Sequence, residues 1–114
     1  MFDLARQRSS TNEQLRIADL MQLTPQGERL LEIGARDCYI TRKLKSLYPH
    51  ITALDLTQPE IDEPGITPVQ GDVTALDFAD NTFDTVFCTE VLEHIPPQKL
   101  AQACHEIERV TSHY

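Results

Sequence analysis

The sequence predicts an α/β fold in which helices flank a mostly parallel sheet. Short apolar runs bounded by turn residues lie at 29–33, 51–56 and 83–88, and such runs are typical of strands buried on both faces. Stretches with helical spacing of apolar residues separate or follow these runs. Strands joined through a helix or a long crossover form right-handed parallel units. We therefore expect a single α/β domain across residues 1–114.

A helix is expected near 11–22, ahead of the first strand. Thr11 and Gln14 have the spacing of a capping box, and apolar residues then recur at helical intervals. Pro25 begins the turn that ends this helix. Residues 1–27 are therefore expected to form a helical lead-in to the sheet.

The stretch "YITRKLKSLYP" after the first strand is expected to be the second helix. Ile40, Leu44 and Leu47 share one helical face, and Pro49 stops the helix. The strand at 51–56 follows.

A loop at 57–65 leads to a short third strand at 66–70, the segment "ITPVQ". Pro68 has no N–H to donate, which places this strand at an edge of the sheet. The fourth strand, "FDTVFC" at 83–88, is the most apolar of the four.

The last predicted element is a helix that starts at Pro96 and Pro97, where proline suits the first turn. Leu100, Cys104 and Ile107 are expected to lie on one face of this helix.

Composition narrows the class of partner. The chain has 114 residues, of which 40% are hydrophobic, and a net charge of -8. Such an acidic chain carries no basic footprint for a phosphate backbone, so nucleic acid is not expected as a partner. Three cysteines form no CxxC pair, and no apolar stretch reaches the roughly 20 residues of a membrane span. We expect a cytoplasmic protein without membrane association.

The turn after the first strand lacks glycines that a dinucleotide site needs. Counted from Gly34, the pattern G-x-G-x-x-G meets Arg36 and Tyr39, and Cys38 also stands where such turns usually carry glycine. Asp55 ends the second strand, where an acid would bind ribose hydroxyls. An adenosine ligand without phosphates, such as S-adenosylmethionine, explains both facts. A strand-to-helix turn that binds nothing is the alternative.

The segments "LEIGARDC", "ALDL" and "GDVTALDFADNTFDTVFCTEVLEHI" together give the sequence a family resemblance. Over about residues 28–110 it resembles the class I S-adenosylmethionine-dependent methyltransferases of the small-molecule type (methyltransferase type 11-like). The resemblance implies a Rossmann-like, doubly wound sheet. Complete members continue through three more strands, so this chain corresponds to the N-terminal, cofactor-binding part, truncated after about four strands.

The resemblance implies a group of residues around the amino-acid part of the cofactor. Glu32 matches an acid associated with the methionine ammonium, and Gly34 and Ala35 match the loop under the methionine. Cys88 and Thr89 match the exit of the fourth strand, where backbone groups face the same moiety.

A second implied group surrounds the adenosine. Asp55 matches the ribose acid and Leu56 the residue that packs on the adenine. Asp72 matches the acid that accepts the adenine amine, with Val73 beside it. For each aspartate alone, a cap of the turn at a strand end is the favoured interpretation, but their joint occurrence reverses that preference in favour of the cofactor.

Glu90, Glu93 and His94 have i, i+3 and i+4 spacing, so on a helical turn they could converge on a metal ion. Some methyltransferases that act on RNA 3′ ends resemble this pattern, but they add a later histidine that has no counterpart here. We favour helix capping, no metal, and a substrate-facing His94 that is a candidate general base.

The sequence thus predicts a methyltransferase that transfers a methyl group from S-adenosylmethionine to a small-molecule acceptor, represented here by its truncated N-terminal half. A non-catalytic assembly or regulatory domain with the same fold is the alternative. A nicotinamide-dependent oxidoreductase is disfavoured by Arg36 and Tyr39. Because the fourth strand would lack its usual neighbour, an exposed edge at 83–88 predicts a homodimer.

Overall fold

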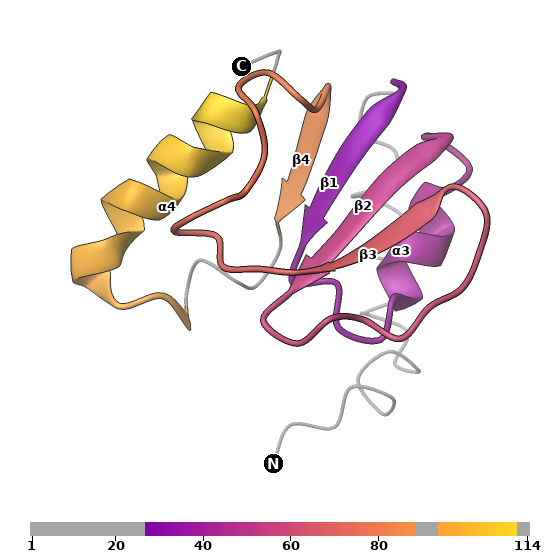
Figure 1. The fold of residues 1–114 in the computed structure, drawn as a ribbon, viewed down its shortest axis with the longest axis horizontal. Coiled ribbons are helices and arrows are strands. Elements are labelled where there is room, and N and C mark those ends of the chain that lie inside the picture. The colour runs from indigo at the N-terminus through magenta and orange to yellow at the C-terminus, as the bar shows by residue number, and fades with distance from the viewer. Residues whose placement is uncertain (1–26, 89–93, 112–114) are drawn as a thin grey trace, which may run out of the picture.

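The computed structural model describes residues 27–88 and 94–111. These residues form one sheet of four parallel strands in the order β3-β2-β1-β4, with two helices (Figure 1). The elements are β1 Arg29–Ile33, α3 Tyr39–Leu44, β2 His50–Asp55, β3 Ile66–Gln70, β4 Thr85–Cys88 and α4 Pro97–Val110. The predicted α/β class and the parallel sheet are confirmed. The helix expected near 11–22 lies outside the described residues.

Strand β1 is central because it pairs on both sides. Its register with β2 runs from Arg29 opposite His50 to Ile33 opposite Leu54. On its other side, Ile33 lies opposite Cys88 of β4. The chain therefore reverses its direction of travel across the sheet at β1, and in open α/β sheets ligands bind beyond the carboxyl ends of the strands at such a point.

Strand β3 pairs with β2 and has no second neighbour among the described strands. Pro68 lies opposite Ala53. The prediction that Pro68 places this strand at an edge is confirmed.

Alternating side chains of the strands divide the core into two clusters. On one face, Leu30 and Ile51 pack with Leu44 of α3 and with Tyr48. On the other face, the strand residues Leu31, Ile33 and Leu54 pack with the 73–83 loop and with Ala103 and Val110 of α4. Figure 1 shows α4 beyond the β4 side of the sheet and α3 beside β2 and β3. Both faces are covered, as the apolar strand sequences require.

Helix α3 is shorter than the sequence predicts. It ends at Leu44, and the amides of Leu47 and Tyr48 both donate to the Leu44 carbonyl in the turn that follows. Tyr48 is fully buried, and its hydroxyl donates to Thr85 Oγ1 at 2.7 Å. The helix ends at Leu44, and the turn that follows places Tyr48 in the core, in contact with β4.

Helix α4 begins at Pro97 as predicted. Of the three apolar residues on the predicted face, Ile107 packs against the core. Leu100 is 39% exposed and Cys104 is exposed, whereas Ala103 and Val110 are buried. Arg109 fixes this rotation, because its guanidinium donates to the carbonyls of Leu76 (2.8 Å) and Phe78 (2.7 Å). No helix in the described part of the chain is long and apolar enough to cross a membrane.

Candidate functional site

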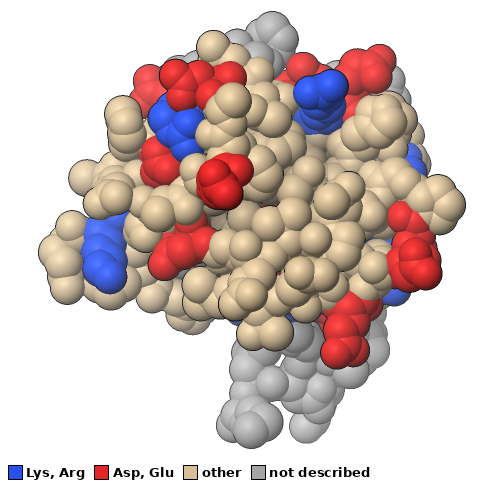
Figure 2. Space-filling model, viewed as in Figure 1, with Lys and Arg blue, Asp and Glu red and all other residues tan. Residues whose placement is uncertain are grey.

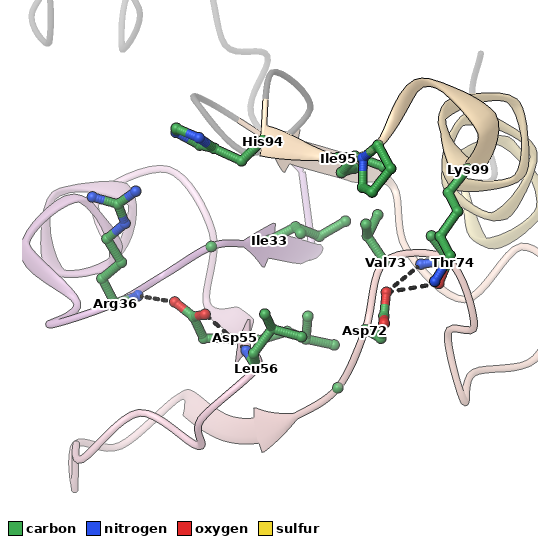
Figure 3. A pocket seen from close by; sticks show the side chains of 14 residues that line it. Ile33, Arg36, Asp55, Leu56, Asp72, Val73, Thr74, His94, Ile95 and Lys99 are labelled. Atoms are coloured by element: carbon green, nitrogen blue, oxygen red, sulfur yellow. Dashed lines mark hydrogen bonds between the residues drawn. The ribbon is translucent and has the colours of Figure 1, made fainter.

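A pocket of about 360 Å³ opens at the carboxyl ends of β1, β2 and β3, between these strand ends and the start of α4 (Figure 3). Of the residues predicted for a cofactor, Gly34, Asp55, Leu56, Asp72 and Val73 line it, and His94 does as well. The topology brings together residues that lie up to 60 positions apart in the sequence. The pocket lies where parallel α/β sheets bind ligands.

The turn between β1 and α3 forms one wall and keeps a glycine-like backbone. The amides of Gly34 and Ala35 donate to the Leu54 carbonyl at 2.8 and 3.1 Å. Gly34 has φ 82°, and Arg36 and Cys38 have φ 55° and 64° although neither is glycine. Each non-glycine residue in this left-handed region costs about 1 kcal/mol.

Arg36 and Cys38, which stand where glycine is usual, place their side chains in different environments. Cys38 is fully buried in the core cluster on the α3 side of the sheet, and burial raises the pKa of its thiol. Its side chain thus points away from the pocket. Arg36, by contrast, is exposed and lines the pocket. An L side chain at φ 55° cannot follow the direction that it takes in a helix or a strand.

Asp55 stands at the end of β2 with its carboxylate held in place by two backbone amides. Arg36 N donates to Oδ2 at 2.8 Å, and Leu56 N donates to Oδ1 at 2.7 Å. A carboxylate oxygen can accept more than one hydrogen bond, so each oxygen keeps an acceptor position for a ligand. Asp55 is oriented before any ligand arrives.

Asp72 follows β3 and is held locally. Its Oδ1 accepts hydrogen bonds from Thr74 N at 2.9 Å and Thr74 Oγ1 at 2.8 Å. These bonds, backbone first, and the nearby charge of Lys99 lower the pKa of Asp72. At neutral pH the group is a carboxylate, and its Oδ2 makes no hydrogen bond within residues 27–88 and 94–111.

Apolar side chains separate the two aspartates. Leu56 is 68% exposed, an unusual state for leucine, and it lines the pocket together with Ile33 and Ile95. Val73 contributes from the Asp72 side and is buried. In Figure 3 Leu56 lies between Asp55 and Asp72, and Ile33, Ile95 and Val73 lie above them. A flat apolar ring with hydrogen-bond donors at its ends matches this alternation of acid, apolar wall and acid.

The segment just before α4 closes the pocket from above in Figure 3, where His94 and Ile95 lie over the strand ends. Lys99 stands at the Asp72 side, away from Arg36. Basic side chains on the face in Figure 2 are scattered singly and gather in no patch.

The remaining predicted residues lie near the pocket without lining it. Glu32 is buried, and its carboxylate accepts a hydrogen bond from Thr41 Oγ1 of α3. Ala35 is buried in the turn below Gly34. Cys88 is half-buried at the end of β4, and burial raises the pKa of its thiol to about 11.

The metal alternative stays untested for two of its three residues. Thr89, Glu90 and Glu93 lie outside the described residues. In the part of the chain that is described, no group of three or more His, Cys, Asp or Glu side chains could hold a metal ion.

Three polar residues of the pocket were missed by the sequence analysis. Thr74 follows Asp72 with the spacing of an Asx turn, which the D-V-T triplet could have indicated. Lys99 lies in the first turn of α4, and the sequence alone does not show that this turn is close to the strand ends. Arg36 was noted only as a replaced glycine.

Comparison with known proteins now bears on the pocket. A family of methyltransferase domains matches residues 31–113 of this chain. The chain belongs to the class I S-adenosylmethionine-dependent methyltransferases. The ubiquinone biosynthesis O-methyltransferase of Paraburkholderia xenovorans (strain LB400) is similar, with 28% identity over 92 residues that cover 71% of this chain and 40% of that protein. This methyltransferase chain thus spans less than half the length of that relative.

Solved structures agree with the Rossmann-like fold of this methyltransferase domain. The N-methyltransferase NodS from Bradyrhizobium japonicum WM9, in complex with S-adenosylhomocysteine, matches 93% of this chain and 60% of its own with a TM-score of 0.83 at 20% identity. The YcgJ protein from Bacillus subtilis matches 86% of this chain and 46% of its own, with a TM-score of 0.73 and 21% identity. The prediction of a partial methyltransferase domain is confirmed.

Proposed function

We propose that this domain binds S-adenosylmethionine in the pocket at the strand ends and serves methyl transfer to a small-molecule acceptor. The observation that carries the proposal is the pair of oriented carboxylates, Asp55 and Asp72, on either side of an apolar wall. The methyltransferase family match and the structural similarity to NodS in complex with S-adenosylhomocysteine support the same ligand. Ribose hydroxyls would donate to Asp55, and the exocyclic amine of adenine would donate to Asp72.

Both carboxylates keep acceptor positions for these donors. Asp55 keeps an acceptor position on each oxygen, and Asp72 offers Oδ2. Leu56 and Val73 would pack against the adenine ring between them. Hydrogen bonds of a carboxylate to such donors are worth about 1.5–3 kcal/mol each.

When bound, S-adenosylmethionine supplies an electrophilic methyl group on a sulfonium. The chain contributes alignment and exclusion of water, which carry most of the rate in a displacement of this kind. Gly34 and Ala35 would lie under the amino-acid tail, with Glu32, Cys88 and Thr89 around it. His94 lines the pocket and is exposed, so its imidazole could take a proton from an acceptor that must lose one. The similarity to ubiquinone biosynthesis O-methyltransferases supports a small-molecule acceptor for this chain.

Calorimetric titration with S-adenosylmethionine and S-adenosylhomocysteine tests the proposal. We expect Asp55→Ala to weaken binding by about 100-fold or more, since two charge-assisted hydrogen bonds are lost. Asp62→Ala is the matched control, because Asp62 is an exposed aspartate outside the pocket. Absence of binding by the unmutated chain, or equal losses in both variants, would contradict the proposal.

A second proposal concerns assembly. We propose that two chains associate through the outer edge of β4. Among the described residues, β4 pairs with β1, and a single parallel bridge joins Phe83, just before β4, to Thr111. Unpaired strand edges recruit other strands. Light scattering at high protein concentration should give the mass of a dimer. A monomeric mass under these conditions would exclude this association.

A further inference from the structure

One face of α4 holds the loop that follows Asp72. Gln102, Glu106 and Arg109 lie four and three positions apart, so they share a face of the helix. Each of these side chains forms hydrogen bonds with the backbone of the loop at residues 74–80. We call these three residues the polar stripe of α4.

The bonds of the polar stripe follow the loop in order. Gln102 Nε2 donates to the Thr74 carbonyl at 2.8 Å, and Glu106 Oε1 accepts a bond from Leu76 N at 2.8 Å. Arg109 then donates to the Leu76 carbonyl at 2.8 Å. Residues 76–80 form no strand, so side chains of α4 take the place of a sheet partner for this backbone. The polar stripe therefore fixes the course of the loop along α4.

Gln102 acts at the end of the loop that reaches the pocket. Its partner Thr74 donates to Asp72 Oδ1 through both its backbone N–H (2.9 Å) and its Oγ1 (2.8 Å), and Figure 3 shows both bonds. A third bond, from Ala75 N to the Asp72 carbonyl at 3.0 Å, closes the same turn. The carboxylate of Asp72 is thus oriented by Thr74, and the peptide of Thr74 is held by Gln102.

The two aspartates of the pocket are oriented in different ways. Asp55 accepts bonds from two backbone amides that directly follow the paired strands β1 and β2. Asp72 follows the edge strand β3, and the turn that orients it is tied to α4. A group that binds a ligand in a fixed direction needs neighbours that hold it there before the ligand arrives. For Asp72, the nearest such neighbour on α4 is Gln102.

We propose that Gln102 is a positioning residue for the recognition of adenine and acts through Thr74 on the carboxylate of Asp72. The inference rests on the proposed function, in which Asp72 accepts the exocyclic amine. Gln102 is exposed and does not line the pocket, so it acts through these two residues and not on the ligand itself. Its removal should therefore matter only for ligands that carry the amine.

The test combines a change in the protein with a change in the ligand. S-adenosylhomocysteine is compared with its analogue that carries purine in place of adenine and so differs only in lacking the exocyclic amine. Gln102→Met keeps the length of the side chain and a high helix propensity, but methionine has no group to donate to Thr74. Calorimetric titration should show an affinity for S-adenosylhomocysteine reduced by about fivefold, the effect of about one hydrogen bond. The affinity for the purine analogue should stay within about twofold of that of the unmutated chain.

Gln98→Met is the matched control. Gln98 is also an exposed glutamine of α4, one turn before Gln102, and it lies outside the pocket. This variant should leave both affinities within about twofold of those of the unmutated chain. If Gln98→Met weakens the binding of S-adenosylhomocysteine as much as Gln102→Met does, the effect is a general one of changes in α4, and the inference is overturned.

The remaining outcomes separate the inference from the proposed function. Equal weakening of both ligands by Gln102→Met would indicate a general change in the pocket, and unchanged binding of both would indicate that Asp72 is oriented without α4. Either result would overturn the role of Gln102 and leave the proposed function standing. Binding of neither ligand by the unmutated chain would overturn both.

Discussion

Asp55 and Asp84 stand at opposite ends of β1 and hold the backbone there with the same chemistry. Asp55 accepts a hydrogen bond from Arg36 N, after the end of β1, at 2.8 Å. It also accepts one from Leu56 N, after the end of β2, at 2.7 Å. Asp84 accepts from Glu28 N and Arg29 N at 2.7 and 2.9 Å, where the chain enters β1. Only Asp55 lines the pocket at the carboxyl ends of the strands. Bonding to backbone amides therefore does not identify a functional carboxylate, whereas its place relative to the strand ends does.

The largest effect on stability that we expect from this comparison follows the removal of Asp84. Asp84→Ala leaves two backbone amides at the start of β1 without their charged acceptor. We expect the free energy of unfolding to fall by about 2–3 kcal/mol, measured by urea denaturation. Asp84→Asn keeps one oxygen acceptor and should lose less.

The affinity of the folded Asp84→Ala variant for S-adenosylmethionine should stay within about twofold of the unmutated chain, since the two ends of the strand share no partner. A loss as large as that of Asp55→Ala would break the distinction between a structural and a ligand-binding aspartate.

A smaller effect is expected on the Asp55 side, where strain accompanies the hydrogen bond. Arg36→Gly should raise the free energy of unfolding by about 1 kcal/mol, because glycine adopts φ 55° without a steric cost. Part of this gain is offset by the greater freedom of glycine in the unfolded chain. Urea denaturation without ligand measures it.

Arg36→Ala separates strain from the loss of the side chain. Alanine keeps the unfavourable φ, so we expect no gain in stability from this variant. If alanine and glycine stabilise the domain equally, the arginine side chain and not its backbone conformation is the source of the cost.

Much of the fold could be predicted from the sequence because the strands are buried on both faces and therefore read as apolar runs. Pro68 predicted the edge strand, since it lacks the N–H of a central strand. The rotation of α4 could not be predicted. Leu100 and Cys104 have helical spacing, but the bonds from Arg109 to the carbonyls of the 76–80 loop decide which face is buried.

Candidate site residues were predicted where they follow a strand directly. Asp55 and Asp72 are such residues, and the structure places both in one pocket. The contributions of Lys99 and Arg36 depend on how α4 and a left-handed turn meet the strand ends, and the sequence carries no local signal for either.

Pro68 also sets a limit on how copies of this domain can add to one another. The bonds of Gly71 N to Asp55 O and of Ile51 N to Gly65 O mean that the alternate amides of β3, at 66, 68 and 70, point away from β2, and the amide of Ile66 already donates to Glu63 O at 3.2 Å. The middle one is missing at Pro68. A strand arriving at this edge would lose its central hydrogen bond, which is why the proposed dimer is assigned not to the β3 edge but to the β4 edge. Two chains joined there would present Pro68 at both outer edges, which closes the assembly at two copies and prevents growth into a fibre.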